Sequence, residues 1–242
     1  MIVVMPMAGR GSRFKNKGYE VPKPLIDVNG LPMFVQSLKS LNDLSFDLLV
    51  LIALQEHEDE FKISELLTQY LPDQKTELVL IPDVTEGQLC TVMVAEEYFK
   101  GKPLLIVASD TYILSEIGAD VRKYQASDGL IQVMEMPGDA WSFAKVDEQE
   151  KVIEVAEKVR ISEWASTGTY YFKDGSLFAS FSNAMINAKE KTRGEYYIMP
   201  VYQKYIDEGY QINITKAIEM WDMGNPESLN KFLNKIKNSN EA

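Results

Sequence analysis

After Met1 the chain begins with Ile2-Val3-Val4-Met5-Pro6-Met7-Ala8-Gly9-Arg10-Gly11-Ser12-Arg13, and this stretch decides the fold. The apolar run over its first four residues predicts a central strand of a parallel sheet, because such strands are buried on both faces. The following Gly9-x-Gly11 loop lets the backbone pass close to an anion, since no Cβ intervenes. Taken alone, this loop is equally compatible with a tight turn. The sequence is neither a Walker A loop nor a dinucleotide-binding G-x-G-x-x-G motif, because Phe14 takes the third glycine position.

Apolar runs and helical patterns alternate outward from this stretch. Further strands are predicted at residues 25–28, 46–54, 78–81 and 104–108. Helical spacing predicts helices at residues 33–41, 58–70 and 88–99. This alternation is typical of an α/β fold, with a doubly wound, mostly parallel, Rossmann-like sheet and helices on both faces.

The pattern changes from about residue 129. Shorter, partly alternating strands are expected at 131–136, 142–146, 152–156 and 169–172, which predicts a small antiparallel subdomain covering one edge of the sheet. Helices are expected at 176–188, 197–208 and 226–237, strands at 212–217 and 219–221, and a loose tail at 237–242. Because no linker or repeat occurs, we expect a single domain over residues 1–242, with halves at 1–128 and 129–242.

Composition narrows the classes of protein and chemistry. With 242 residues, 45% of them hydrophobic, the chain can bury a sizeable core, and no stretch reaches the roughly 18 apolar residues of a membrane span. The first apolar run lacks the basic segment of a signal peptide, so a cytoplasmic location is expected. One cysteine, Cys90, and one histidine, His57, exclude a disulfide framework, and they exclude Ser-His-Asp and Cys-His catalysis unless these two residues meet. Because acids surround His57, we expect it to be solvated, in a loop or at a helix start.

Charge separates the opening segment from the rest. The net charge of −11 disfavours binding of nucleic acid or of an anionic membrane. The first 19 residues nevertheless contain no acid and several bases, which indicates a local anion site, with a solvated basic loop as the alternative. The basic residues are Arg10, Arg13, Lys15, Lys17 and, shortly after, Lys23.

Two carboxylates are predicted at strand ends on the edge that carries the glycine-rich loop. Asp110 follows the apolar run that ends at Ala108, and Asp222 follows a second short strand. Ligands of open α/β sheets bind beyond the carboxyl ends of the strands, so Asp110 is placed to hold Mg²⁺. The alternative is that Asp110 caps the N-terminus of a helix. Because Mg²⁺ usually takes one or two carboxylates plus substrate phosphates, Asp110 and Asp222 together predict a half-cage of two carboxylates that faces the phosphate-binding loop.

These segments together resemble the nucleotide-sugar pyrophosphorylases, the sugar-phosphate nucleotidyltransferase family. The resemblance runs from Ile2 to Leu229, and its most specific part is the G-x-G-[ST]-R loop followed by Pro-Lys-Pro-Leu. The matching segments are Pro6–Phe14, Val21–Val28, Pro32-Met33, Ser109-Asp110, Glu157-Lys158, Gly168–Phe172, Arg193–Tyr196 and Trp221–Glu227.

The resemblance implies a reaction and a role for each position. A nucleoside monophosphate would pass from an NTP to a sugar 1-phosphate, releasing pyrophosphate and supplying nucleotide-activated sugars for cell-surface polysaccharide synthesis. The half 1–128 would bind the NTP and 129–242 the acceptor, with Mg²⁺ as cofactor. Arg13 and Lys23 would be catalytic, bracing the pyrophosphate and contacting the attacked phosphate, and Asp110 and Asp222 would share the metal. The remaining NTP ligands would be Ala8, Gly9, Arg10, Gly11, Ser12, Gly87 and Gln88, and the acceptor ligands Glu157, Lys158, Gly168 and Arg193.

Departures from the family pattern keep other functions open. Val159 replaces the usual proline after Glu-Lys, and Asn225 stands where threonine is usual. One alternative is therefore a cytidylyltransferase for a non-sugar phosphate such as phosphocholine or an amino-acid-derived phosphate, with Trp141 and Trp164 caging a quaternary ammonium. A glycosyltransferase would need an Asp-x-Asp motif, which is absent at Asp110, and a silent nucleotide-binding subunit would not need the retained site residues. The expected partners are an NTP and a small phosphorylated acceptor, and binding to nucleic acid or membranes is not expected. The sequence is compatible with a homo-oligomer and does not reveal the oligomeric state.

Overall fold

The computed structural model describes residues 1–240, and its main sheet is built around β1 (Ile2–Pro6). This strand pairs in parallel with β4 (Leu48–Leu54) on one side and with β6 (Leu104–Ile106) on the other, and β4 pairs in parallel with β5 (Thr76–Ile81). The strands β1, β4 and β6 are buried along nearly their whole length. The apolar runs are therefore central parallel strands, as their lack of a polar face predicts.

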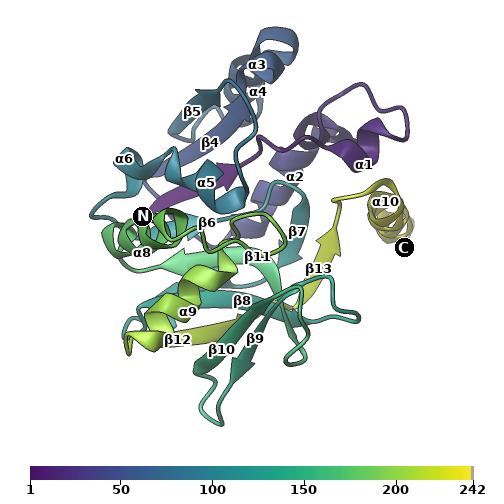
Figure 1. The fold of residues 1–242 in the computed structure, drawn as a ribbon. Coiled ribbons are helices and arrows are strands. Elements are labelled where there is room, and N and C mark those ends of the chain that lie inside the picture. The colour runs from purple at the N-terminus through teal and green to yellow at the C-terminus, as the bar shows by residue number, and fades with distance from the viewer. Residues whose placement is uncertain (241–242) are drawn as a thin grey trace.

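Helices cover both faces of this parallel part (Figure 1). Val4 of β1 points into a core that includes residues of α5 and α6, whereas its neighbours Val3 and Met5 pack with α2, α4 and α7. This two-sided cover confirms the expected doubly wound α/β fold. The helices of this half are α1 (Ser12–Lys15), α2 (Met33–Leu38), α3 (Gln55–Phe61), α4 (Ile63–Tyr70), α5 (Gln88–Met93), α6 (Glu96–Phe99) and α7 (Ile117–Lys123), with short 3-10 helices at Lys23–Leu25 and Lys39–Leu41.

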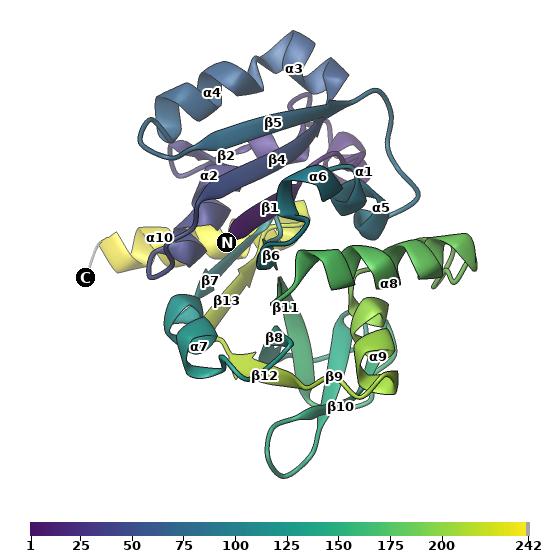
Figure 2. The ribbon, with the colours of Figure 1, turned by 90° about the vertical axis from the view of Figure 1, so that its left-hand side faces the viewer.

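The antiparallel strands continue the same sheet instead of forming a separate one. β11 (Trp164–Phe172) pairs antiparallel with β6, and its other neighbours are β8 (Gly129–Glu135) and β9 (Ser142–Val146). β10 (Val152–Glu157) extends the sheet beyond β9, and β12 (Ile212–Lys216) runs parallel to β8. Figure 2 shows α8 (Gly175–Asn187) and α9 (Met199–Asp207) against this half. The two halves of the chain therefore share one continuous sheet.

A small second sheet connects the two halves near the glycine-rich loop. It pairs β7 (Thr111–Leu114) antiparallel with β13 (Glu219–Asp222), and the C-terminal helix α10 (Pro226–Asn240) follows (Figures 1 and 2). Met223 and Phe232 from this end pack against Phe14 of α1. The last segment of the chain therefore supports the loop that follows β1. A further hairpin pairs β2 (Asp27–Val28) with β3 (Leu31–Pro32).

Several sequence expectations are corrected by the structure. The helix predicted at 58–70 is two helices, because Lys62 adopts a left-handed conformation with φ 52° between α3 and α4. The helix predicted at 88–99 is likewise divided into α5 and α6. The predicted tail is helical to Asn240, and residues 241–242 lie outside the described part.

The environment of His57 also differs from the expectation. The residue lies near the start of α3, as expected, but only 6% of it is exposed, so it is buried and not solvated. Within residues 1–240 no helix is both long enough and apolar enough to cross a bilayer.

Candidate active site

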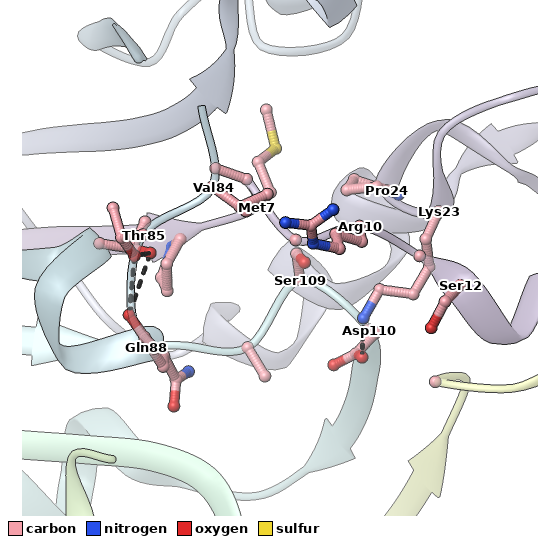
Figure 3. A pocket seen from close by; sticks show the side chains of 18 of the residues that line it. Met7, Arg10, Ser12, Lys23, Pro24, Val84, Thr85, Gln88, Ser109 and Asp110 are labelled. Atoms are coloured by element: carbon pink, nitrogen blue, oxygen red, sulfur yellow. Dashed lines mark hydrogen bonds and ion pairs between the residues drawn. The ribbon is translucent and has the colours of Figure 1, made fainter. Parts of the chain in front are cut away.

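A cavity of about 490 Å³ opens at the carboxyl ends of β1 and β6, where the sheet fold predicts a ligand site. Figure 3 shows Lys23 and Asp110 toward one end of this cavity, Thr85 and Gln88 toward the other, and Arg10 between them. All seven residues expected to bind the NTP line it, together with Arg13, Lys23 and Asp110. The others are Pro6, Met7, Pro24, Val84, Thr85, Thr91, Ala108, Ser109, Glu195 and Gly224.

The glycine-rich loop is held close to Lys23. Gly11 has φ +59°, and a Cβ there would lie 3.3 Å from the Lys23 Cβ. Both the left-handed backbone and the contact favour glycine. Arg10 and Arg13 are exposed, so their guanidinium groups are available to phosphate oxygens. By contrast, a Cβ on Gly9 would meet nothing within 4 Å, so Gly9 is not required by packing.

Lys23 and Asp110 form an ion pair in the cavity, with 2.5 Å between Nζ and Oδ2 and 23% of each side chain exposed. Burial alone would raise the pKa of Asp110, but the Lys23 ammonium, through charge and hydrogen bond, brings that pKa below its ordinary value. Asp110 is therefore ionised and available as a ligand for a cation. It precedes β7, a strand, so the alternative of a helix cap is wrong.

The pairing of β7 with β13 brings Asp222 to Asp110. Asp222 is opposite Thr111, the residue after Asp110, and the Met223 amide donates to the Asp110 carbonyl over 2.7 Å. A Cβ built on Gly224 would lie 2.9 Å from Asp222 Oδ1 and 3.1 Å from Asp110 Oδ2. The two carboxylates therefore flank one small space that a larger residue at position 224 would fill.

This donor set fits Mg²⁺. No group of three or more His, Cys, Asp or Glu side chains suited to a metal occurs among residues 1–240. Two carboxylates leave most coordination positions to water and substrate phosphates, which is how Mg²⁺ is usually bound.

The far end of the cavity is shaped by close backbone packing at Gly87. Its φ is +138°, and a Cβ there would lie 2.6 Å from the Tyr196 nitrogen. Leu89 N donates to the Tyr196 carbonyl, and Tyr196 N donates to the Glu86 carbonyl. Beside them, Thr85 and Thr91 share a hydrogen bond of 2.7 Å. Gln88 lines the cavity, so its amide is available to a ligand there.

The residues expected on the acceptor side form a second cluster. Glu157 is 8% exposed and accepts a 2.5 Å hydrogen bond from the Ser142 hydroxyl. Burial raises the pKa of Glu157, against opposing effects of Ser142, Lys158 and Arg193. Lys158 Nζ donates to the Tyr197 hydroxyl and lies 4.3 Å from that ring's centroid, and Arg193 donates to the Lys158 carbonyl. A buried carboxylate thus lies beside two cations.

This cluster and Asp222 do not line the cavity itself, but two residues connect the acceptor cluster to it. Glu195, which lines the cavity, is close enough to affect the pKa of both Glu157 and Tyr197. Gly168 lies at an irregularity of β11, and a Cβ there would be 3.1 Å from the Cβ of Ala108, another lining residue. The acceptor cluster therefore adjoins the cavity.

Sequence reasoning missed several polar residues here: Thr85, Thr91, Ser142, Glu195 and Tyr197. Thr85 and Glu195 could have been suspected, because they flank motif residues in the chain. Ser142 and Tyr197 carry no such signal, since 15 and 39 residues separate them from their partners Glu157 and Lys158.

Cysteine chemistry finds no support at this site. Burial and the nearby Glu86 carboxylate raise the pKa of the Cys90 thiol. Reactive cysteines have a depressed pKa, so Cys90 lacks the property that a nucleophile needs.

Comparison with known families agrees with this geometry, because residues 3–239 match the model of the nucleotidyl transferase family. The chain belongs to this family. This nucleotidyl transferase is also similar to solved structures over nearly its whole length. A nucleoside-diphosphate-sugar pyrophosphorylase from Vibrio cholerae RC9 is 28% identical, with a TM-score of 0.83 over 96% of this chain and 99% of that one.

More distant structures share the fold of this nucleotidyl transferase. A UDP-glucose pyrophosphorylase in complex with UDP-glucose is 14% identical, with a TM-score of 0.81 over 98% of both chains. The inositol-1-phosphate CTP transferase of T. maritima is 15% identical, with a TM-score of 0.76 over 98% of this chain and 96% of that one. No curated protein gives a significant match.

Proposed function

We propose that this nucleotidyl transferase moves a nucleoside monophosphate from an NTP to a sugar 1-phosphate, with Mg²⁺, to make a nucleotide-activated sugar. The observation that carries the proposal is the joint position of Lys23, Asp110 and Asp222. Lys23 and Asp110 line the same cavity as the glycine-rich loop, Asp222 lies beside Asp110, and the acceptor cluster adjoins this cavity, so two anions could meet here. The nucleoside-diphosphate-sugar pyrophosphorylase from Vibrio cholerae has the same overall fold. Of the three structures compared, it has the highest sequence identity to this chain.

The reaction needs positive charge more than a protein nucleophile. An oxygen of the acceptor phosphate attacks the α-phosphorus in line, a new P–O bond forms, and the bond from the α-phosphorus to the β-phosphate oxygen breaks. The bonding electrons leave with pyrophosphate. Lys23 would contact the attacked phosphate, and Arg13 would stabilise the charge on the leaving group.

The two substrates are held by different parts of the chain. The loop from Gly9 to Arg13 would hold the NTP phosphates, and Lys158 and Arg193 would hold the acceptor phosphate next to them, which lowers the entropic cost of the encounter. Asp110 and Asp222 would bind Mg²⁺, which when present neutralises charge on the phosphates.

The acceptor cluster favours a sugar over a quaternary ammonium compound. The buried Glu157 carboxylate and the partly buried Ser142 hydroxyl form a polar pair suited to hydroxyl groups. The alternative aromatic cage is not supported, because Lys216 Nζ already lies 4.6 Å from the Trp164 ring centroid. The Trp141 carbonyl accepts from Lys158 N, but its indole nitrogen donates to the Pro137 carbonyl, and no second free aromatic ring accompanies it in the described acceptor cluster. A non-sugar polyol phosphate is a second candidate acceptor. The T. maritima protein that shares the fold is described as an inositol-1-phosphate CTP transferase.

Pyrophosphate release tests this function. The purified protein would be incubated with Mg²⁺ and each of CTP, UTP, dTTP, GTP and ATP, against sugar 1-phosphates, inositol 1-phosphate and phosphocholine. We expect release that requires both one NTP and one sugar 1-phosphate. Release that requires phosphocholine instead, or no release with any pair, would contradict the proposal.

A further inference from the structure

Tyr197 lies against Lys158 in the acceptor cluster, although 39 positions separate the two residues in the chain. The Lys158 ammonium donates a hydrogen bond to the Tyr197 hydroxyl and lies 4.3 Å from the centroid of the same ring. The face of an aromatic ring attracts a cation. The ring and the hydroxyl of one tyrosine therefore act together on one ammonium group.

The backbone of Lys158 is held on both sides. Its amide donates to the Trp141 carbonyl over 2.9 Å, and its carbonyl accepts from the Arg193 guanidinium over 3.0 Å. Its φ is 55°, a left-handed conformation that costs free energy for a lysine and that these contacts offset. The remaining freedom of Lys158 lies in its long side chain, whose end Tyr197 restrains.

The backbone on either side of Tyr197 is fixed as well. The neighbouring residues Tyr196 and Ile198 are 2% and 1% exposed. The Tyr196 amide donates to the Glu86 carbonyl, and the Tyr196 carbonyl accepts from the Leu89 amide. A tyrosine side chain has only two torsions to order. Tyr197 is therefore a rigid support for the flexible side chain of Lys158.

Tyr197 holds the ammonium without cancelling its charge. Within residues 1–240 the Lys158 ammonium forms no ion pair with a carboxylate. Burial raises the pKa of Tyr197, and the nearby Glu195 carboxylate adds to this effect while Lys158 opposes it. The phenol is therefore protonated and neutral at pH 7. Because an ammonium group has three donors, Lys158 keeps both its charge and further donors for an incoming anion.

We propose that Tyr197 is a positioning residue for Lys158, which it orders through its ring and its hydroxyl before an acceptor phosphate binds. The phosphate then meets a cation that is already in place, so binding costs less conformational entropy. This inference deepens the proposed function, because it rests on Lys158 binding the acceptor phosphate. The phosphate is common to all acceptors, so Tyr197 acts on affinity for the acceptor and not on the choice between sugars.

NMR can observe the contact without turnover. Protons above the face of an aromatic ring are shifted upfield, so protein labelled with ¹³C at lysine Cε is expected to show an upfield Hε signal that is missing in K158Q. Y197F retains the ring and should retain the shift, whereas Y197L should abolish it. Titration with inorganic phosphate should move the signal saturably, with an affinity about threefold or more weaker in Y197L.

Steady-state kinetics provide a readout that a merely structural role would not reproduce. Y197L is expected to raise the KM of the acceptor by about fivefold, and Y197F by a smaller factor, with kcat within about twofold of the natural value. The factor should be the same for every sugar 1-phosphate that is accepted. Y124F and Y124L are matched controls, because Lys123 Nζ lies 4.7 Å from the Tyr124 ring centroid and Tyr124 does not line the cavity.

Three results would overturn the inference: a Lys158 Hε signal at its ordinary position in the natural protein, an upfield shift that persists in Y197L, or an acceptor KM in folded Y197L within about twofold of the natural value. If circular dichroism shows that Y197L does not fold, the signal of the natural protein and the KM of Y197F decide. An unchanged KM in Y197F would then contradict the inference.

Failure of the inference is distinguishable from failure of the proposed function. A protein that is inactive with every acceptor, but whose upfield Lys158 signal responds to phosphate, would keep the role of Tyr197 and lose the proposed function. An active protein without an upfield Lys158 signal would keep the proposed function and lose the role of Tyr197.

Discussion

We propose that Asp110 serves two partners, Lys23 and a cation. In the protein without substrate its carboxylate is paired with Lys23, while the space next to Asp222 and Gly224 is where we propose Mg²⁺. Lys23 would contact the NTP phosphates, and Asp110 would then hold a cation in place of the ammonium group. The ion pair therefore keeps the buried carboxylate compensated before the substrates arrive.

Removing either proposed metal ligand should abolish turnover without unfolding the protein. Asp110→Ala and Asp222→Ala are each expected to lower Mg²⁺-dependent kcat/KM by about 100-fold or more, because charge on the phosphates is no longer neutralised. Exposed Asp73→Ala provides the matched control. Near-normal activity of either variant with an unchanged circular dichroism spectrum would contradict the two-carboxylate site.

Lys158 should act on the acceptor alone. Lys158→Ala is expected to raise the KM of the acceptor by about tenfold or more and to leave the KM of the NTP within about twofold, because Lys158 lies in the acceptor cluster. Steady-state kinetics with each substrate varied in turn measure both constants. Lys145→Ala, at a half-exposed surface position, serves as the control. A larger effect on the NTP would remove Lys158 from the acceptor side.

The ionised Glu157 carboxylate is expected to lower the free energy of unfolding at neutral pH. Its pKa is raised by burial, so the folded state binds this proton more tightly than the unfolded chain. Stability from this group is complete below its ordinary pKa of 4.5 and is lost as the pH rises through the higher folded value.

The variant Glu157→Gln removes this titration. It is therefore expected to raise the free energy of unfolding at pH 7 relative to the natural protein, to leave it little changed at pH 4, and to weaken acceptor binding. Urea unfolding at both pH values measures the difference. A variant less stable than the natural protein at pH 7 would show that the ionised Glu157 is well compensated.

At the scale of helices and strands, the close approach of Gly87 to Tyr196 joins segments 109 positions apart in the chain. Gly87→Ala introduces a Cβ into backbone atoms at a left-handed φ. We expect a loss of about 1–3 kcal/mol in the free energy of unfolding and a raised KM for the NTP. Gly101→Ala is the control, because Gly101 also has a positive φ but has open space around it. Its loss of stability measures backbone strain alone, and any additional loss in Gly87→Ala comes from the contact with Tyr196. Equal losses in the two variants would show that the contact with Tyr196 contributes nothing.

Local signals explain which elements could be predicted. The strands β1, β4 and β6 follow from uninterrupted apolar runs, and Lys23, Asp110 and Asp222 lie in short motifs next to strand ends. The break at Lys62 could not be predicted, since helical spacing continues through it without Gly or Pro. The pairing of β11 with β6, like the Tyr197 contact to Lys158, depends on long-range packing that no local pattern records.

At the scale of the whole molecule, the shared sheet makes the two halves of the chain interdependent. β6 of the first half is hydrogen-bonded to β11 of the second, and β7 is paired with β13. A cavity bordered by both halves is therefore held by one sheet, and residues 1–128 alone would leave β6 as an uncovered apolar edge.

Unfolding should accordingly be a single transition. All three tryptophans lie after residue 128, so their fluorescence reports on the second half, whereas far-UV circular dichroism reports on both. We expect the two probes to give coincident urea transitions. Separate midpoints would show that the halves are independent domains.

The central claim, nucleotidyl transfer to a sugar 1-phosphate, is tested most directly by phosphorus NMR of the complete reaction with Mg²⁺ and the productive NTP. We expect the phosphomonoester signal of the sugar to disappear while two mutually coupled diphosphate signals and a pyrophosphate signal appear, with the diphosphate product and pyrophosphate formed in equal molar amounts. Loss of NTP with an unchanged sugar phosphate signal, or diphosphate formation only with an acceptor that is not a sugar, would contradict it.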